Sequence, residues 1–113
     1  MKDDRYYLTL IGEYIEKINE YTQEGHDHFL QDEKTQDAVI RKLQILTETT
    51  QRLSDDIKSM EPAIPWQDIA GLRNILVHQY TDVNVSRIWL ILRNDLPRLS
   101  EFVDCALDML NKE

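Results

Sequence analysis

The sequence predicts an all-α fold, and three observations support this prediction. Apolar residues recur at the spacing of amphipathic helices along most of the chain, no segment keeps the two-residue alternation of a strand, and only three glycines and three prolines interrupt the 113 residues. The chain contains no internal repeat and is long enough for one core. We therefore expect residues 1–113 to form a single domain, an antiparallel bundle of about five helices.

Two long helices are expected in the first half of the chain. The first covers residues 4–22, and its apolar stripe consists of Leu8, Ile11, Ile15 and Ile18. The second covers residues 32–60, and its apolar stripe consists of Val39, Ile40, Leu43, Leu46, Leu53 and Ile57. Phe29 and Leu30, which lie between these helices, are expected to pack back onto the bundle.

A loop at Gly25-His26-Asp27-His28 is expected to separate the two helices. His26 and His28 are potential metal ligands, but no third ligand is predictable nearby. We therefore interpret this segment as a structural or solvated loop and expect no metal there.

A stiff connector and three more helices are expected in the second half. The prolines of Pro62-Ala63-Ile64-Pro65 fix their own φ and restrict the residues before them, and the second proline begins a helix in which Trp66 is a packing anchor. After Tyr80, the polar residues 81–84 predict a turn and a helix cap. The last two helices have apolar stripes made of Val85, Ile88, Trp89 and Leu92, and of Leu99, Phe102, Val103, Ala106, Leu107 and Leu110.

The chain has the features of a cytoplasmic protein. Its first residues precede no apolar run that resembles a signal peptide, and no apolar segment is long enough to span a bilayer. The single Cys105 cannot form an internal disulfide and is expected to be a small core residue of the last helix. We expect a cytosolic protein that does not associate with membranes.

The charge balance argues against a general nucleic-acid binder. With a net charge of −8 and a pI near 4.8, the protein as a whole repels polyanions. A selective cleft requires that cations are concentrated in one region, and the candidate cations are Arg73, Arg87, Arg93 and Arg98 in the second half and Arg41, Lys42 and Arg52 on the second helix. Each of them is also compatible with a solvated face or an ordinary ion pair.

Most common enzyme signatures are absent, and one short run carries the chemistry that remains. The sequence has no Gly-rich phosphate loop, nucleophile elbow, Cys pair or zinc motif, so we expect no cofactor and no metal. Within Arg73-Asn74-Ile75-Leu76-Val77-His78-Gln79-Tyr80, Arg73 can grip a phosphodiester with two hydrogen bonds and His78 can carry a proton at neutral pH. The alternative is a solvated arginine and an ordinary surface histidine.

Helical geometry divides this run into two faces. At about 100° per residue, Ile69, Leu72 and Leu76 form one apolar stripe, with Arg73 and Tyr80 along its edge. The opposite side carries Gly71, Ile75 and His78, with Asn74 and Gln67 beside them. Such a helix has two faces to bury, and the second face suits a second subunit, so we expect a homodimer with His78 at its seam.

The run from Pro65 to Tyr80 resembles the signature of HEPN-domain proteins of the HepT-like branch, in which Arg, four residues, His, one residue and Tyr form the core. The resemblance extends to residues 37–43, 85–89 and 95–97 and covers nearly the whole chain. One departure is Thr47-Glu48-Thr49, where relatives commonly carry Gly-Glu-Ala. The glutamate keeps its register but has bulkier neighbours.

The resemblance implies a toxin ribonuclease of a type VII-like HEPN/MNT toxin–antitoxin pair, which cleaves RNA without a metal in the cleft of a dimer. Arg73 and His78 are then catalytic, and a structured RNA such as tRNA is a reasonable substrate. The partner implied is a minimal nucleotidyltransferase (MNT) antitoxin that adenylylates Tyr80. Tyr80 is equally compatible with a simple packing role at the edge of the core.

Two supporting residues are expected around the motif. Asn74 can orient the His78 ring or the phosphate, although an exposed asparagine without a role fits as well. Glu48 is expected to hold or neutralise a cation of the motif from the second helix.

A second class of function also fits the sequence. The chain can be a non-catalytic dimeric adaptor that binds a nucleotidyltransferase, with the motif as interface or nucleotide-binding groove. The intact Arg73, His78 and Tyr80 favour the ribonuclease, because an adaptor has no evident need for all three. The excess of acidic over basic residues favours the adaptor.

Overall fold

Long helices make up most of the fold. The computed structural model describes residues 2–112, except for the side chains of Lys2 and Tyr80. Its longer helices are α1 (Lys2–Tyr21), α3 (Glu33–Thr50), α5 (Trp66–His78), α6 (Val85–Asn94) and α7 (Leu96–Asn111). Shorter elements are α2 (His26–Gln31), α4 (Asp55–Lys58) and the 3₁₀-helix η1 (Tyr80–Asp82). Residues 2–112 contain no strand, which confirms the predicted all-α class.

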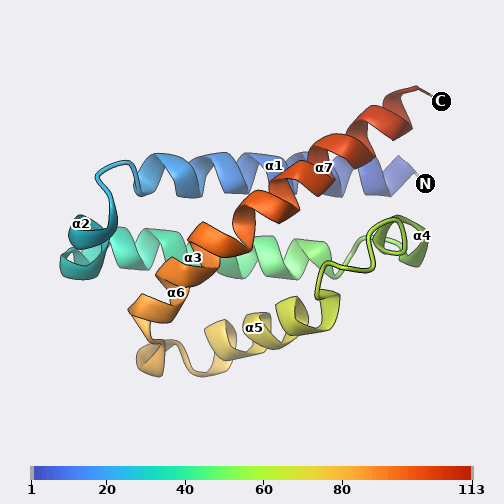
Figure 1. Ribbon diagram of the computed structural model, residues 1–113. Coiled ribbons are helices and arrows are strands. Elements are labelled where there is room, and N and C mark those ends of the chain that lie inside the picture. Colours follow the sequence, from blue (N-terminus) through green and yellow to red (C-terminus); the bar gives the residue numbers. More distant parts are fainter. Residues whose placement is uncertain (1, 113) are drawn as a thin grey trace.

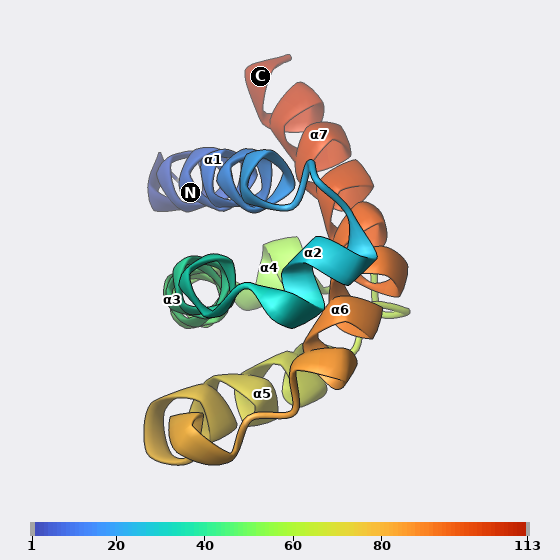
Figure 2. The same ribbon diagram turned by 90° about the vertical axis from the view of Figure 1, so that its left-hand side faces the viewer.

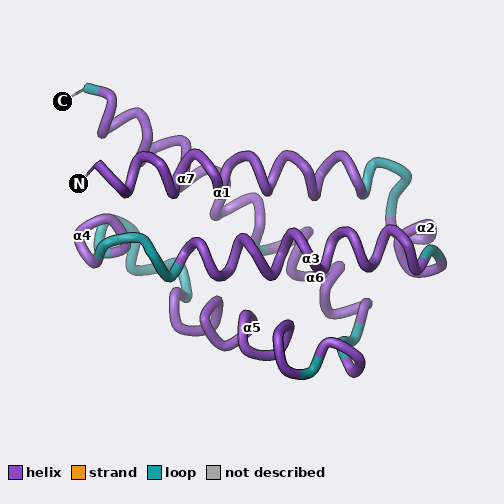
Figure 3. The backbone as a smooth tube through the Cα atoms, turned by 180° about the vertical axis from the view of Figure 1, so that it is seen from behind, coloured by secondary structure: helices purple, strands orange, loops and turns teal. Residues whose placement is uncertain are grey.

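The helices form two layers. α1, α3 and α5 lie side by side and run in alternating directions (Figures 1 and 3). α7 crosses diagonally over this layer and packs against α1, and α6 and α2 lie on the same side as α7 (Figure 2). The outward side of the first layer, which we call the three-helix face, is therefore not covered by the second layer.

The core lies between the layers and follows the predicted stripes. Leu8, Ile11 and Ile18 of α1 are fully buried against Val39 and Leu43 of α3 and the crossing α7. Burial of apolar area on this scale supplies most of the stabilisation of a helical domain. The remaining core residues are Ile15, Phe29, Leu46, Leu53, Ile57, Ile64, Leu76, Ile88, Leu92, Leu96, Leu99, Phe102, Val103, Ala106 and Leu110.

The predicted helix 32–60 is wrong in its second part. α3 ends at Thr50, and a turn leads to the separate short helix α4. Ser54 is the N-cap of α4 and its Oγ accepts from Ile57 N at 3.2 Å. The nearly buried carboxylate of Asp4, on α1, accepts from Ser54 N at 2.8 Å and from Ser54 Oγ at 2.7 Å. These tertiary hydrogen bonds favour a new helix start over continuation of α3.

The segment predicted as a loop at residues 25–28 is largely helical. Gly25 has a φ of 94°, which disfavours other residues, and α2 begins directly after it at His26. The ring of His26 packs edge-on against Trp89, with centroids 5.4 Å apart. Phe29 is fully buried and Leu30 partly buried, so their predicted packing onto the bundle is confirmed.

Asp32 begins α3 by capping it. Its carboxylate accepts hydrogen bonds from the side chain and the backbone N–H of Thr35. The side-chain hydrogen bond from Thr35 is the main cause that lowers the pKa of Asp32, and partial burial opposes it. The cap therefore stabilises the fold above the ordinary pKa of this carboxyl and is lost as the pH falls through the lowered value.

Cys105 is exposed, so its predicted place in the core is wrong. Cys105 lies about 130° around the helix from the centre of the buried side of α7, which consists of Leu96, Leu99, Phe102, Val103, Ala106 and Leu110. In the part of the chain that the structure describes, no helix is both long and apolar enough to cross a membrane.

Replacement of Ser54 tests the link between α1 and α4. Ser54→Ala is expected to lower the free energy of unfolding by about 1–2 kcal/mol, because it removes the cap and one hydrogen bond to the buried Asp4 carboxylate. Urea unfolding followed by circular dichroism measures this loss. The matched control is Ser59→Ala, whose hydroxyl donates to Asp56 O at the exposed end of α4, and which should cost less than about 0.5 kcal/mol. Equal losses in the two variants would contradict the proposed link.

Candidate active site

The start of α5 is fixed by Trp66. Its Nε1 donates to Lys58 O at 3.1 Å and to Glu61 O at 3.2 Å, and its ring packs against Phe102 with centroids 5.3 Å apart. The predicted role of Trp66 as a packing anchor is confirmed. Together with the stiff connector before Pro65, this anchor sets where the residues further along α5 lie on α3.

Arg73 lies where α5 meets α3. Its Nε is 3.7 Å from Glu48 Oε1, so the two side chains form an ion pair that is too long for a hydrogen bond at that atom. The Nε atom is buried and lacks a hydrogen-bond partner among the described residues. The side chain as a whole is 33% exposed, so the guanidinium reaches the surface while its stem is held. The sequence predicted that Glu48 contacts a cation of the motif, and the structure shows that this cation is Arg73.

Two amides extend this contact. Arg73 Nη1 donates to Asn74 Oδ1 at 3.1 Å, and Gln44 Nε2 donates to Glu48 Oε1 at 3.5 Å. Asn74 therefore contacts the arginine, and no hydrogen bond joins it to His78 in the described part of the chain. The sequence analysis missed Gln44, although its position four residues before Glu48 on one helix was a usable signal.

The threonines beside Glu48 are accommodated inside α3. Thr47 and Thr49 are buried, and their hydroxyls donate to Gln44 O at 2.9 Å and to Ile45 O at 2.8 Å. Each buried hydroxyl is thus satisfied by its own helix. The bulkier neighbours leave Glu48 in place to meet Arg73.

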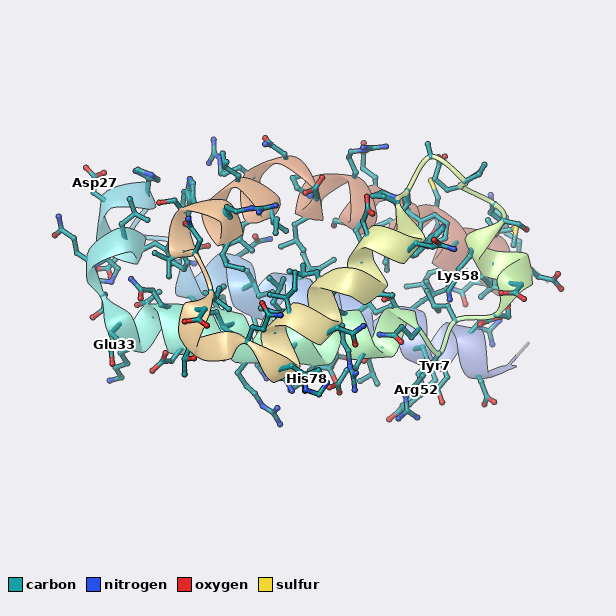
Figure 4. All side chains as sticks on the ribbon, turned by 90° about the horizontal axis from the view of Figure 1, so that it is seen from below. Tyr7, Asp27, Glu33, Arg52, Lys58 and His78 are labelled. Carbon is teal, nitrogen blue, oxygen red and sulfur yellow. The ribbon has the colours of Figure 1, made fainter. Side chains whose placement is uncertain are left out.

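His78 is the last residue of α5 and is exposed. It lies at the edge of the molecule when α5 faces the viewer (Figure 4). Because His78 follows Arg73 by five positions, the two side chains leave the helix about 140° apart. A single chain therefore presents the arginine and the histidine on different sides of α5, without a direct contact between them.

The outward side of α5 is exposed, as the two-faced pattern predicted. Gln67, Gly71, Asn74 and His78 are all exposed, and Ile75 retains 45% of its accessible surface. A Cβ added at Gly71 would meet no atom within 4 Å. Nothing in the chain itself therefore requires glycine at this position or covers the isoleucine.

A groove of about 620 Å³ runs beside this side of α5, between α5 and the ends of α6 and α7. Its floor is apolar and its rim carries two cations and two carboxylates. The apolar residues include Leu43, Leu72, Ile75, Ile91 and Leu99, and the charged ones are Asp68, Arg87, Asp95 and Arg98.

Two further candidate positions are Tyr80 and His28. Tyr80 belongs to η1, but its side chain lies outside the described part of the structure. His28 Nε2 lies 2.9 Å from Glu24 and 3.5 Å from Asp32, and no group of three potential ligands among the described residues is arranged to hold a metal ion.

Comparison with known proteins assigns the chain to a family. The family model for HepT-like ribonucleases matches residues 11–106, and the chain belongs to this family. It is 43% identical to a "Probable ribonuclease HepT" of Thermococcus cleftensis over 94 residues, which is 82% of this chain and 86% of the relative. No solved structure matches the chain significantly.

Two further relatives are each named "Putative RNase". One, from Methanocaldococcus jannaschii, is 39% identical over 85% of this chain and 80% of its own length. The other, from Caldanaerobacter subterraneus, is 31% identical over the whole of this chain and 99% of its own length. Membership of the family supports a ribonuclease role for the chain.

Glu48→Gln tests whether the ion pair positions Arg73 for activity. The change keeps the shape of the side chain and removes its charge, so we expect cleavage of total cellular RNA to slow by about tenfold, because Arg73 is less firmly held. The free energy of unfolding should change by less than about 1 kcal/mol, since the pair is partly exposed. Glu101→Gln, the same change at an exposed glutamate of α7 in the other layer, is the matched control. Unaltered cleavage by Glu48→Gln would overturn a positioning role.

Proposed function

We propose that the chain is the toxin ribonuclease of a HEPN/MNT toxin–antitoxin pair, and that it cleaves RNA without a metal in a cleft formed by two copies. The observation that carries this proposal is the placement of Arg73 and His78. Both reach the surface from α5, about 140° apart around the helix, and the arginine is held by Glu48. Cleavage of a phosphodiester requires an anchored cation and an exposed proton carrier, which two copies of the chain can bring together.

The reaction follows from these two groups. The imidazole of one His78 takes the proton of the ribose 2′-hydroxyl, and the 2′-oxygen attacks the adjacent phosphorus. The bond from phosphorus to the 5′-oxygen breaks, and the second copy's His78 donates a proton to that leaving oxygen. Arg73 stabilises the charge on the non-bridging oxygens. The products are a 2′,3′-cyclic phosphate and a free 5′-hydroxyl.

The second copy supplies what one chain lacks. One histidine cannot act as base and acid at the same time, and a two-fold dimer through α5 would bring two motifs together. The exposed Ile75, the open space at Gly71 and the apolar groove are the features that a second copy would cover. Charges of both signs on the groove rim suit a self-complementary interface.

The antitoxin part of the proposal concerns Tyr80, which follows His78 by two residues. An adenylate transferred to its hydroxyl by a nucleotidyltransferase would add a negative charge and bulk beside the histidine. An RNA phosphate could then no longer approach the motif. Tyr80 is thus proposed as the position at which the partner silences the ribonuclease.

A second candidate is a dimeric adaptor without catalytic activity that binds a nucleotidyltransferase. The observation that favours it is the net charge of −8, which opposes RNA binding by the molecule as a whole. The experiment below separates the two candidates, because only the ribonuclease produces cleaved RNA.

Purified protein with total cellular RNA and EDTA tests the proposed reaction. Wild type is expected to cleave and to leave cyclic-phosphate ends, and Arg73→Ala and His78→Ala are each expected to lose at least about 100-fold in rate. Arg93→Ala and His26→Ala are matched controls that should cleave as wild type does. Cleavage that survives both motif replacements would exclude these roles. No cleavage by wild type that is folded and dimeric would favour the adaptor.

The interface is tested by Ile75→Asp. A carboxylate in the covered face should weaken the dimer by at least about 100-fold in dissociation constant, because it would be buried without a partner. Sedimentation equilibrium measures the change. Leu90→Asp is the control, since Leu90 is 56% exposed and is not one of the residues that line the groove. A wild type that stays monomeric, or equal effects of the two changes, would contradict the interface.

A further inference from the structure

Three cations on the three-helix face have no carboxylate partner. Arg41 and Lys42 lie on α3, and Arg52 lies in the turn that follows it. Among the residues that the structure describes, none of the three has a carboxylate oxygen within 4 Å, whereas Arg73 on the same side has one. No ion pair among the described residues therefore neutralises their charges, although the chain carries more acidic than basic residues.

Two of these cations are held by aromatic rings of α1. Lys42 Nζ lies 5.6 Å from the centre of the Tyr14 ring, and the Arg52 guanidinium lies 6.0 Å from the centre of the Tyr7 ring. A ring attracts a cation through its quadrupole and leaves the net charge in place. The tyrosines thus limit the motion of Lys42 and Arg52 without neutralising them.

These cations share one surface with the proposed catalytic residues. In Figure 4, Arg52, Tyr7 and His78 lie along the same edge of the molecule. Lys42 lies where α3 meets α1, and Arg73 lies where α3 meets α5. Because packed helices are about 8–10 Å apart, the row from Lys42 to Arg73 crosses one helix width.

Two acidic side chains of α3 lie on this face. Glu48 is engaged by Arg73, and Asp37 lies one turn from Arg41 without an ion pair. A row of separated positive charges, two of them held by rings, matches the repeating phosphates of an extended nucleic-acid strand, and the acidic remainder of the molecule repels the same strand elsewhere.

We propose that Arg41, Lys42 and Arg52 form a phosphate-binding track that holds the single RNA strand flanking the cleaved bond and leads it across α3 to Arg73. This inference rests on the proposed ribonuclease function and adds where the substrate lies. The track binds the phosphate backbone of the RNA and not its bases. It therefore contributes to the affinity and to the register of the strand but gives no base specificity. Tyr7 and Tyr14 are positioning residues, since they act through the cations that they hold.

Binding of a short fluorescein-labelled, 2′-O-methylated single-stranded RNA tests the track by fluorescence anisotropy. This probe lacks the attacking hydroxyl, so binding is measured without cleavage. Lys42→Ala and Arg52→Ala should each weaken binding by about threefold to tenfold and lower the slope of log K against log salt by about 0.7. Arg93→Ala is the matched control, since Arg93 lies 6.0 Å from the Trp89 ring on α6, in the other layer, and should bind as wild type does.

The positioning role of Tyr14 is tested with a conservative pair of variants. Tyr14→Phe keeps the ring and should bind RNA as wild type does, whereas Tyr14→Leu should bind as weakly as Lys42→Ala. Thermal unfolding shows whether both variants remain folded. Equal affinities of folded Phe and Leu variants would overturn the role of the ring.

Cleavage of unmodified RNA separates this inference from the proposed function. With active wild type, Lys42→Ala and Arg52→Ala should raise KM by a similar factor and leave kcat unchanged. Weakened binding in the track variants supports the track even if wild type cleaves nothing, in which case the ribonuclease proposal alone fails. Normal cleavage and unchanged binding in both variants would overturn the track alone, and no binding of the probe by wild type would also overturn it.

Discussion

The packing of α5 onto α3 through only one of its two faces is the constraint on which the rest of the molecule depends. Leu76 is buried against α3, while Ile75, one residue along, retains 45% of its surface. An amphipathic helix normally turns polar residues toward water. Here the second face carries a glycine, an isoleucine and the histidine, so the fold of one chain leaves apolar surface that association can still bury.

The same packing of α5 on α3 determines the contacts and the position of the Arg73 side chain. A partly exposed ion pair at 3.7 Å contributes little to stability, and the buried Nε without a hydrogen bond opposes it. The contact with Glu48 therefore acts mainly on position. It limits the directions in which the guanidinium can point and leaves part of it at the surface. Such an arrangement suits a residue kept for binding an anion more than one kept for folding.

The net charge alone does not indicate whether this protein binds nucleic acid, because its charges are unevenly distributed over the surface. The total of −8 argues against nucleic-acid binding, yet three cations on the three-helix face have no carboxylate partner among the described residues. Aromatic rings, rather than acids, hold two of them. A cation–π contact is consistent with a local positive field inside a negative molecule, whereas an ion pair would cancel that field.

Much of the fold was predictable because it follows from local periodicity. The stripes of α1, α6 and α7 lie on the sides that the spacing indicated, and the exposed side of α5 is the one expected from 100° per residue. The errors have different causes. The break after Thr50 is tertiary, because it depends on Asp4, which is 50 residues away in the chain from Ser54, and Cys105 is exposed because it lies outside the buried stripe of α7.

The sequence by itself determined the helical class, the family resemblance and the identity of the motif, because these depend on residue type and spacing along one helix. Only the tertiary structure decided that Glu48 meets Arg73, that Gln44 supports Glu48 and that Tyr7 and Tyr14 hold cations of α3 and the following turn. Contacts between helices depend on how the helices are rotated and offset against one another. That arrangement is set by the packing of the whole core, which no local pattern in the chain specifies.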